Sequence, residues 1–399
     1  MKELKKSGKR FLAAVILAAA GLLAGCGGAA APAASSAQTE ASAAAVRTEA
    51  AEISAQDSKA AETGTQASSA EKVRVVATIF PEYDWLRNVI GENADHVELR
   101  LLLDKGVDMH SFQPTAEDVM TIASCDLFVY VGGESDTWTA DALKNSVNPD
   151  QISVDLMETL GSRVKEEELV EGMQEADHEH AHEGGDHGRE EGDHGHEGED
   201  HGREEGDHGH EGEDHGHGEA PEYDEHVWLS LKNAEVLTER LAEAMAEADP
   251  ACADSYRANA EQYLEKLAAL DAEYTDAVAA APKKTVLFGD RFPFRYLTDD
   301  YGLEYYAAFS GCSAETEASF ETIIFLAEKA DSLGLGAVLT IENSDQKIAK
   351  TIVSGTKTKD QKILSMDSMQ SVTAADAGSG PDYLARMREN LEVLKEALQ

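Results

Sequence analysis

Positive charge is scarce in this sequence of 399 residues, in which 34 Lys and Arg side chains stand against 77 Asp and Glu side chains. The formal net charge is therefore −43 at pH 7. Proteins that bind nucleic acid neutralise its phosphates with clustered Lys and Arg, and the sequence has no such basic stripe. We expect no nucleic acid partner, whereas cations are natural partners of so acidic a chain.

Cysteine is also scarce, with four residues in the whole chain. One of them, Cys26, belongs to the N-terminal segment discussed below, which leaves Cys125, Cys252 and Cys312. Three thiols allow at most one disulfide, and no two of them have the spacing of a metal site. The sequence therefore assigns no function to these three cysteines.

Catalytic metal motifs are missing as well. A zinc hydrolase needs an open coordination position and a positioned general base, and the sequence contains no His-Glu-x-x-His or comparable motif. We therefore expect a protein that is not an enzyme.

The N-terminus has the features of a targeting segment. Four lysines and an arginine fall within the first ten residues, and residues 11–23 form an apolar stretch too short to span a membrane comfortably. The sequence Leu23-Ala24-Gly25-Cys26 resembles the lipobox of bacterial lipoproteins. This resemblance implies a signal peptide over residues 1–25 and a lipidated Cys26 that holds the protein on the outer face of the cytoplasmic membrane. A plain cleaved signal with an incidental cysteine is the alternative.

Residues 26–71 consist mostly of Ala, Ser, Thr, Gln, Glu and Gly, which predicts a flexible tether. A second stretch of unusual composition covers residues 166–223. Gly and acidic residues dominate it, so it buries too little apolar surface to offset its ordering entropy, and we expect a disordered acidic loop.

Histidine is concentrated in this loop, which holds eleven of the fourteen histidines in a pattern that repeats every fourteen residues. Imidazole suits borderline-soft ions such as zinc, so we interpret these histidines as auxiliary metal ligands. A solvated linker without a role, a sensor of excess metal or a metal buffer are the alternatives. The histidines are His178, His180, His182, His187, His194, His196, His201, His208, His210, His215 and His217.

The rest of the chain alternates predicted strands with predicted helices. Regular alternation of this kind favours the α/β class, with mostly parallel sheets covered by helices. We expect two such lobes, at 72–165 and 284–399, joined by a long helical connection at 224–283 that breaks near Asp249-Pro250, with a metal cleft between the lobes. The predicted strands are 73–79, 97–103, 127–131, 152–154, 285–288, 305–309, 337–341 and 362–366, and helices are predicted from Pro81 to near Gly91 and at 115–124, 137–144 and 381–398.

Two short motifs carry the functional prediction. Gly106-Val107-Asp108-Met109-His110 and the stretch from Asp224 to Asn233 resemble the first two metal-ligand motifs of the metal-specific solute-binding proteins of bacterial ABC importers, the ZnuA/TroA-like family. The resemblance covers residues 72–399 and implies that His110 and His226 bind the metal. A histidine-rich insertion directly before the second motif is a habit of the zinc-specific members. His96 lacks such a context, and we expect it to be a surface residue.

The resemblance also implies ligands from the second lobe, and here the sequence departs from the family pattern. Arg291 stands where the third ligand, usually His or Glu, is expected, and arginine cannot bind a cation. We predict that the adjacent Asp290 replaces it, with a helix N-cap as the alternative role of Asp290. Glu342 matches the fourth ligand, and residues 311–319 match a loop that is structural in the family.

Two imidazoles with one or two carboxylates suit Zn²⁺, although Mn²⁺ or iron would also accept such a set. Eleven further imidazoles have little use for manganese, so we favour zinc. The prediction is a zinc receptor that delivers its cargo to an ABC permease with its ATPase and acts as a monomer. A manganese or iron receptor, or a surface zinc buffer or adhesin without transport, remain as alternatives.

Overall fold

The computed structural model describes residues 72–174, 222–313 and 317–399, which all belong to one compact unit. The predicted signal peptide, the lipidation site Cys26, the tether and the eleven clustered histidines lie outside the described residues. Among the residues that the structure describes, no helix is long and apolar enough to cross a membrane.

Two four-stranded sheets form the framework, and every pair of neighbouring strands in them is parallel. The predicted α/β class with two lobes is confirmed. The orders are β2-β1-β3-β4 in the first lobe and β6-β5-β7-β8 in the second. The strands are β1 (Val73–Ala77), β2 (Val97–Leu101), β3 (Leu127–Tyr130), β4 (Ile152–Asp155), β5 (Thr285–Phe292), β6 (Glu304–Ser310), β7 (Ala337–Ile341) and β8 (Lys362–Met366).

The central strands are short apolar runs because helices cover both faces of each sheet. All five residues of β7 are buried, and so are the first three residues of β3. The helices of the first lobe are α1 (Phe80–Ile90), α2 (Ala116–Ser124), α3 (Thr139–Lys144) and α4 (Leu156–Leu160). The helices of the second lobe are α7 (Arg295–Tyr301), α8 (Phe320–Leu333), α9 (Lys347–Gly355), α10 (Ala374–Ser379) and α11 (Tyr383–Ala397).

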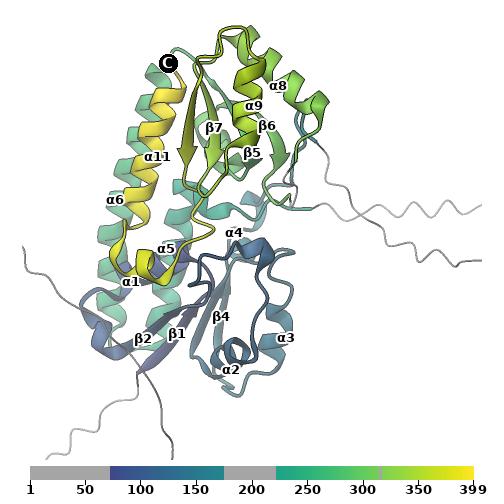
Figure 1. Cartoon of the computed structure of the whole chain (residues 1–399). Helices are drawn as coiled ribbons and strands as arrows, with labels where there is room; N and C mark the ends of the chain where they lie inside the picture. Colours follow the sequence, from purple (N-terminus) through teal and green to yellow (C-terminus); the bar gives the residue numbers. More distant parts are fainter. Residues whose placement is uncertain (1–71, 175–221, 314–316) are drawn as a thin grey trace, which may run out of the picture. The chain divides into compact units, whose positions relative to one another are not determined.

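Two long helices connect the lobes, as predicted. They are α5 (Leu231–Ala248) and α6 (Ala253–Ala280), and they pack against each other. The expected break falls between them, at Asp249 and Pro250, because proline cannot continue the hydrogen-bond ladder of a helix. Figure 1 shows α6 beside α11, and α6 contacts both α1 of the first lobe and α11 of the second. One rigid element therefore supports both lobes.

The strand predicted at residues 285–288 was much too short. Instead of ending at Phe288, β5 continues to Phe292, with a register shift against β6 between Phe288 and Arg291. Asp290 therefore lies inside the strand. The alternative that Asp290 caps a helix is wrong, because α7 begins at Arg295 with Phe294 at its N-cap position.

The two ends of the predicted acidic loop are held together. Glu166 and Tyr223 form an antiparallel bridge, and the Asp224 amide donates to the Lys165 carbonyl at 2.9 Å. The Gln174 amide donates to the Ala308 carbonyl at 3.0 Å, which ties the same region to β6. These contacts bring the residues around Tyr223 next to the second lobe.

Candidate metal site

His110 follows β2, in the one-turn 3-10 helix η2 (Met109–Ser111). The Asp108 carboxylate caps this turn and accepts a hydrogen bond from the His110 amide at 3.1 Å. The Nδ1 atom of the His110 ring lies 2.8 Å from the Ser135 hydroxyl oxygen, in the loop after β3. Asp108 after β2 and Ser135 after β3, at the carboxyl ends of two strands of the same sheet, therefore hold His110 and leave its Nε2 atom for another partner.

His226 is completely buried and precedes the 3-10 helix η4 (Val227–Leu229) at the start of the helical connection. Its Nδ1 atom lies 2.8 Å from Asp224 Oδ1, and its amide donates to the same oxygen at 2.9 Å. A carboxylate on one ring nitrogen fixes the tautomer and the orientation of a metal-binding histidine. The Nε2 atom of His226 is thereby left to face the cleft.

The two rings meet with their Nε2 atoms 3.2 Å apart. Two nitrogens that bind one tetrahedral zinc ion at 2.0–2.1 Å are separated by about 3.3 Å, so this spacing fits a shared cation. Burial and the neighbouring His226 lower the pKa of His110 to about 3. Burial also disfavours the charged form of His226, but the Asp224 carboxylate outweighs it and raises the pKa of His226 above its usual value.

Gln370 completes the surroundings of His226 from the second lobe, where its side chain is buried. With its amide nitrogen directed at the Asp108 carboxylate, 3.2 Å from each oxygen, its carbonyl oxygen lies 3.0 Å from His226 Nε2. Asp108 and His226, from different motifs, are therefore joined by one side chain of the second lobe.

A third potential ligand beside the two histidines is Cys312, in the loop after β6. One ring nitrogen from each histidine and the Cys312 sulfur all lie within 4.8 Å of one another. The preceding residue must be small, because a Cβ atom on Gly311 would lie 2.8 Å from Cε1 and 2.9 Å from Nδ1 of His226. The loop backbone thus packs directly on the His226 ring.

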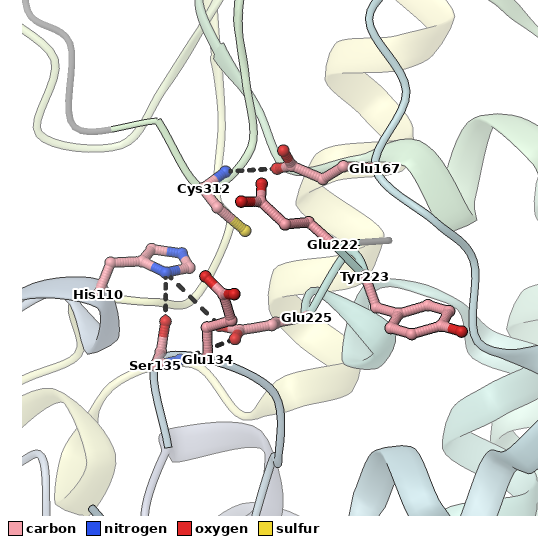
Figure 2. Close-up of a pocket in the computed structure, with 8 residues that line it drawn as sticks. All are labelled: His110, Glu134, Ser135, Glu167, Glu222, Tyr223, Glu225 and Cys312. Atoms are coloured by element: carbon pink, nitrogen blue, oxygen red, sulfur yellow. Dashed lines mark hydrogen bonds and ion pairs between the residues drawn. The ribbon is translucent and has the colours of Figure 1, made fainter. Parts of the chain in front are cut away.

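Figure 2 shows the pocket in which His110 and Cys312 meet, with a volume of about 260 Å³. Carboxylates dominate its lining, and Glu225 is the most buried of them. The Glu225 Oε1 atom accepts a hydrogen bond from the Ser135 amide at 2.8 Å, and its Oε2 atom lies 3.6 Å from His110 Nδ1. The lining residues are His110, Glu134, Ser135, Glu167, Glu222, Tyr223, Glu225 and Cys312.

The two predicted carboxylate ligands lie in a larger neighbouring cavity of about 820 Å³. Both oxygens of Glu342 accept hydrogen bonds from Ser368, at 2.7 Å from the amide and 2.6 Å from the hydroxyl. Asp290 Oδ1 accepts from the Arg291 amide at 2.9 Å, and its Oδ2 atom is buried without a hydrogen-bond partner among the described residues. Neither carboxylate belongs to the group formed by His110, His226 and Cys312.

Arg291, which stands at the expected third-ligand position, is turned toward the first lobe. Its Nη2 atom lies 2.8 Å from Asp108 Oδ2. Burial by itself would raise the pKa of Asp108, but the Arg291 guanidinium and His110 outweigh burial and hold it below its usual value. Arg291 therefore links the two lobes beside the histidine pair.

A second group of possible ligands lies away from the cleft, where η1 (Gly91–His96) meets the α5–α6 turn. His96 Nδ1 is 3.6 Å from Cys252 Sγ and 3.9 Å from Asp249 Oδ2. His96 is exposed, as predicted, but it has polar neighbours that the sequence did not indicate.

Sequence reasoning missed Ser135, Gln370 and Cys312. These residues follow three different strands, β3, β8 and β6, and are far apart in sequence. No sequence motif therefore contains them together. A signal was available for Cys312 alone, because this residue directly follows Gly311 in a segment that resembles a family loop with leucine at that place.

Comparisons with known proteins found zinc-binding relatives. The chain is 29% identical over 325 residues to the zinc-binding lipoprotein AdcA of Streptococcus pneumoniae serotype 4, covering 82% of this chain but only 56% of AdcA. It is 26% identical over 337 residues to the high-affinity zinc uptake system protein ZnuA of Bacillus subtilis, covering 84% of this chain and 90% of that protein.

The fold is that of the zinc-bound ZnuA-like domain of Streptococcus pneumoniae AdcA, with a TM-score of 0.57 at 24% identity. The superposition covers 82% of this chain and 99% of that domain. A family model described as "Zinc-uptake complex component A periplasmic" matches residues 75–397, so the chain belongs to the ZnuA family.

Proposed function

We propose that the chain is an extracytoplasmic receptor that binds Zn²⁺ between its two lobes and delivers it to an ABC permease for import. The observation that carries this proposal is the pair of Nε2 atoms at 3.2 Å, contributed by His110 and His226. Asp224 and Ser135 hold the opposite nitrogens of the two rings. Both rings are thus oriented before a cation arrives, which lowers the cost of binding.

The protein's own residues account for capture. The pocket beside His110 is lined by carboxylates, whose negative charge concentrates cations at its mouth. Asp290 and Glu342 line the neighbouring cavity, and we propose that a carboxylate from this side, Glu342 first, completes the shell when the lobes shift slightly. Release on docking to the permease would reverse that shift. Support from α6 on both lobes keeps the movement small.

The membrane anchor and the histidine-rich segment belong to the same proposal. A lipidated Cys26 would hold the receptor at the outer face of the cytoplasmic membrane, and the relative named a zinc-binding lipoprotein supports this assignment. The eleven histidines from His178 to His217 would gather zinc near the pocket, whose lining includes Glu222. No catalytic role and no partner copy of the chain are part of the proposal.

Calorimetric titration with zinc and manganese tests the proposal, on metal-stripped protein that lacks residues 178–217. We expect one tight zinc site that His110→Ala abolishes and that His96→Ala, at the separate group on η1, leaves intact. Tighter binding of manganese than of zinc would overturn the cargo assignment. If the protein without residues 178–217 has no tight zinc site, the proposal that this site lies in the cleft is wrong.

Transport requires partners, which gene order can test. Neighbouring genes for a membrane permease and an ATPase would support delivery to an importer. If deletion of those genes leaves receptor-dependent zinc uptake unchanged, the receptor role is wrong and a metal buffer takes its place.

A further inference from the structure

We propose that Cys312 binds the zinc ion through its sulfur, as the third ligand beside His110 and His226. It would take the role that the sequence analysis gave to Asp290. This inference rests on the proposed function, because it concerns the same cation in the same cleft.

The geometry is close to that of a bound ion. The Cys312 sulfur and one nitrogen of each histidine lie within 4.8 Å of one another. Zinc bonds of 2.0–2.1 Å to nitrogen and 2.3 Å to sulfur separate tetrahedral N and S ligands by about 3.5 Å. A movement of the Cys312 sulfur by about 1 Å toward the ring nitrogens would bring the atoms from the 4.8 Å limit close to this spacing. Cys312 lies just outside β6, so this shift leaves the sheet undisturbed.

Two contacts hold Cys312 in this place. The Gly311 backbone packs on the His226 ring so closely that no Cβ atom fits between them. The Cys312 amide donates a hydrogen bond to Glu167 Oε1 at 3.2 Å, in the segment that runs beside Glu222. The thiol is therefore positioned by its own backbone and by the His226 ring. The conformation of the loop therefore places Cys312 beside the two histidines.

A buried carboxylate oxygen without a hydrogen bond in the same pocket is independent support for a cation there. Glu225 is 2% exposed, and its Oε2 atom has no hydrogen-bond partner among the described residues. Three further carboxylates, of Glu134, Glu167 and Glu222, line the pocket. A buried carboxylate oxygen that lacks a hydrogen bond is costly, and a divalent cation nearby lowers that cost.

A bound cation would change the protonation state of Cys312. Burial and the nearby carboxylates of Asp224, Glu167 and Glu225 raise the pKa of the Cys312 thiol well above its usual value. A coordinating metal ion deprotonates a thiol outright. The zinc–sulfur bond forms as the S–H bond breaks, and the proton leaves to the buffer. Zinc with one thiolate and two neutral imidazoles carries a net charge of +1, opposite to that of Glu225.

The competing ligands are less well placed. Arg291 cannot bind a cation, and Asp290 lies in the neighbouring cavity, outside the group formed by His110, His226 and Cys312. Among the described residues, the group that contains both cleft histidines has Cys312 as its third member. A thiolate is a soft ligand, which favours zinc over manganese in a site that the family motifs alone leave open to both.

Cobalt substitution tests the assignment on the full chain. Thiolate-to-cobalt charge transfer gives a near-ultraviolet absorption that imidazole and carboxylate ligands do not produce. The histidine-rich segment therefore does not contribute to it. We would titrate Co²⁺ into a chain with Cys26→Ser and Cys252→Ser, in which Cys125 and Cys312 are the remaining thiols, and into the same chain with Cys312→Ser. Cys125 is buried within the first lobe. It is present in both chains, so any absorption that differs between them comes from Cys312.

We expect the charge-transfer band at one equivalent of cobalt in the first chain and its loss with Cys312→Ser. Zinc affinity, measured by competition with a chelator, should fall by about 100-fold or more with Cys312→Ser. Loss of a residue that only orients a ligand lowers metal affinity by about 10- to 100-fold, and loss of a ligand itself should cost at least as much. The preference for zinc over manganese should fall with it.

Three outcomes separate the two proposals. Tight binding of one zinc ion without a thiolate band, or a band that survives Cys312→Ser, overturns Cys312 as a ligand and leaves the receptor function standing. Absence of a tight zinc site in every variant overturns the receptor function itself. Protection of Cys312 from alkylation by one equivalent of zinc is expected only if Cys312 binds the ion, and the folding of each variant is checked by circular dichroism.

Discussion

The Nε2 atoms of His110 and His226 lie 3.2 Å apart, although 116 positions separate the two residues along the chain. His110 belongs to a turn after β2 of the first lobe, and His226 precedes the helical connection. Ser135 contacts the Nδ1 atom of His110, and Asp224 contacts the Nδ1 atom of His226. The distance between the two Nε2 atoms therefore depends on how these chain segments pack together. The predictions below test that packing.

Asp224→Asn should weaken zinc binding about 10- to 100-fold, the range for loss of an outer-shell partner of a metal-bound histidine. The Asp224 carboxylate orients His226 through Nδ1, and an amide would hold the ring less firmly and without charge. Chelator competition measures the change. Asp118→Asn, in the N-terminal cap of α2, is the matched control and should leave zinc affinity unaltered. Equal affinities of the two variants would contradict the orienting role.

Gly311→Ala should lower both zinc affinity and stability. The added Cβ atom would meet the His226 ring at 2.8 Å and the Phe292 carbonyl oxygen at 3.0 Å, so the loop must move. Overpacking of this kind typically costs about 1–3 kcal/mol. Gly336→Ala is the control, because a Cβ there meets no atom within 4 Å. Urea denaturation and zinc titration of both variants would reveal a difference, and unchanged affinity in Gly311→Ala would speak against close packing on His226.

The stability of the metal-free protein should fall as the pH rises from about 4.5 to about 8, because of Glu82. Burial and the neighbouring Asp136 raise the pKa of Glu82 to about 8. In this window the folded chain holds a proton that the unfolded chain has released, so each pH unit removes up to about 1.4 kcal/mol of unfolding free energy. Burial also raises the pKa of Asp136 to about 7, which adds to the same trend.

Glu82→Gln should flatten this pH dependence, because a neutral amide has no proton to lose. Urea denaturation across the window measures the slope for the wild type, for Glu82→Gln and for Glu98→Gln, an exposed control on β2. The slope should persist in the control. A wild-type protein as stable at pH 8 as at pH 4.5 would contradict the burial argument.

Deletion of residues 178–217 should reduce the number of zinc ions bound per chain and leave the tightest site within a few-fold of its original affinity. The deleted histidines supply additional imidazoles, whereas His110 and His226 remain. Equilibrium dialysis over a wide range of free zinc separates the two classes. If the number of bound ions does not change, the segment is not a zinc reservoir.

The elements of the fold could be predicted from local pattern. Short runs rich in β-branched and apolar residues marked the eight strands, most clearly the central strands β3 and β7, because strands covered on both faces must be apolar. Asp249-Pro250 marked the end of α5, because proline cannot continue the hydrogen-bond ladder in the interior of a helix. The extension of β5 to Phe292 was missed, because Asp290 and Arg291 are poor strand residues that only pairing with β6 keeps extended.

The candidate site divides in the same way. The residues next to His110 and His226 form recognisable motifs, so the sequence by itself determined which histidines to consider. Tertiary structure alone decided that their Nε2 atoms face each other, that Arg291 pairs with Asp108, and that Cys312 lies beside the pair. A sequence motif predicts the role of residues that are close together along the chain. Distances between side chains on different strands depend on how the sheets, loops and α6 pack together, which no local pattern contains.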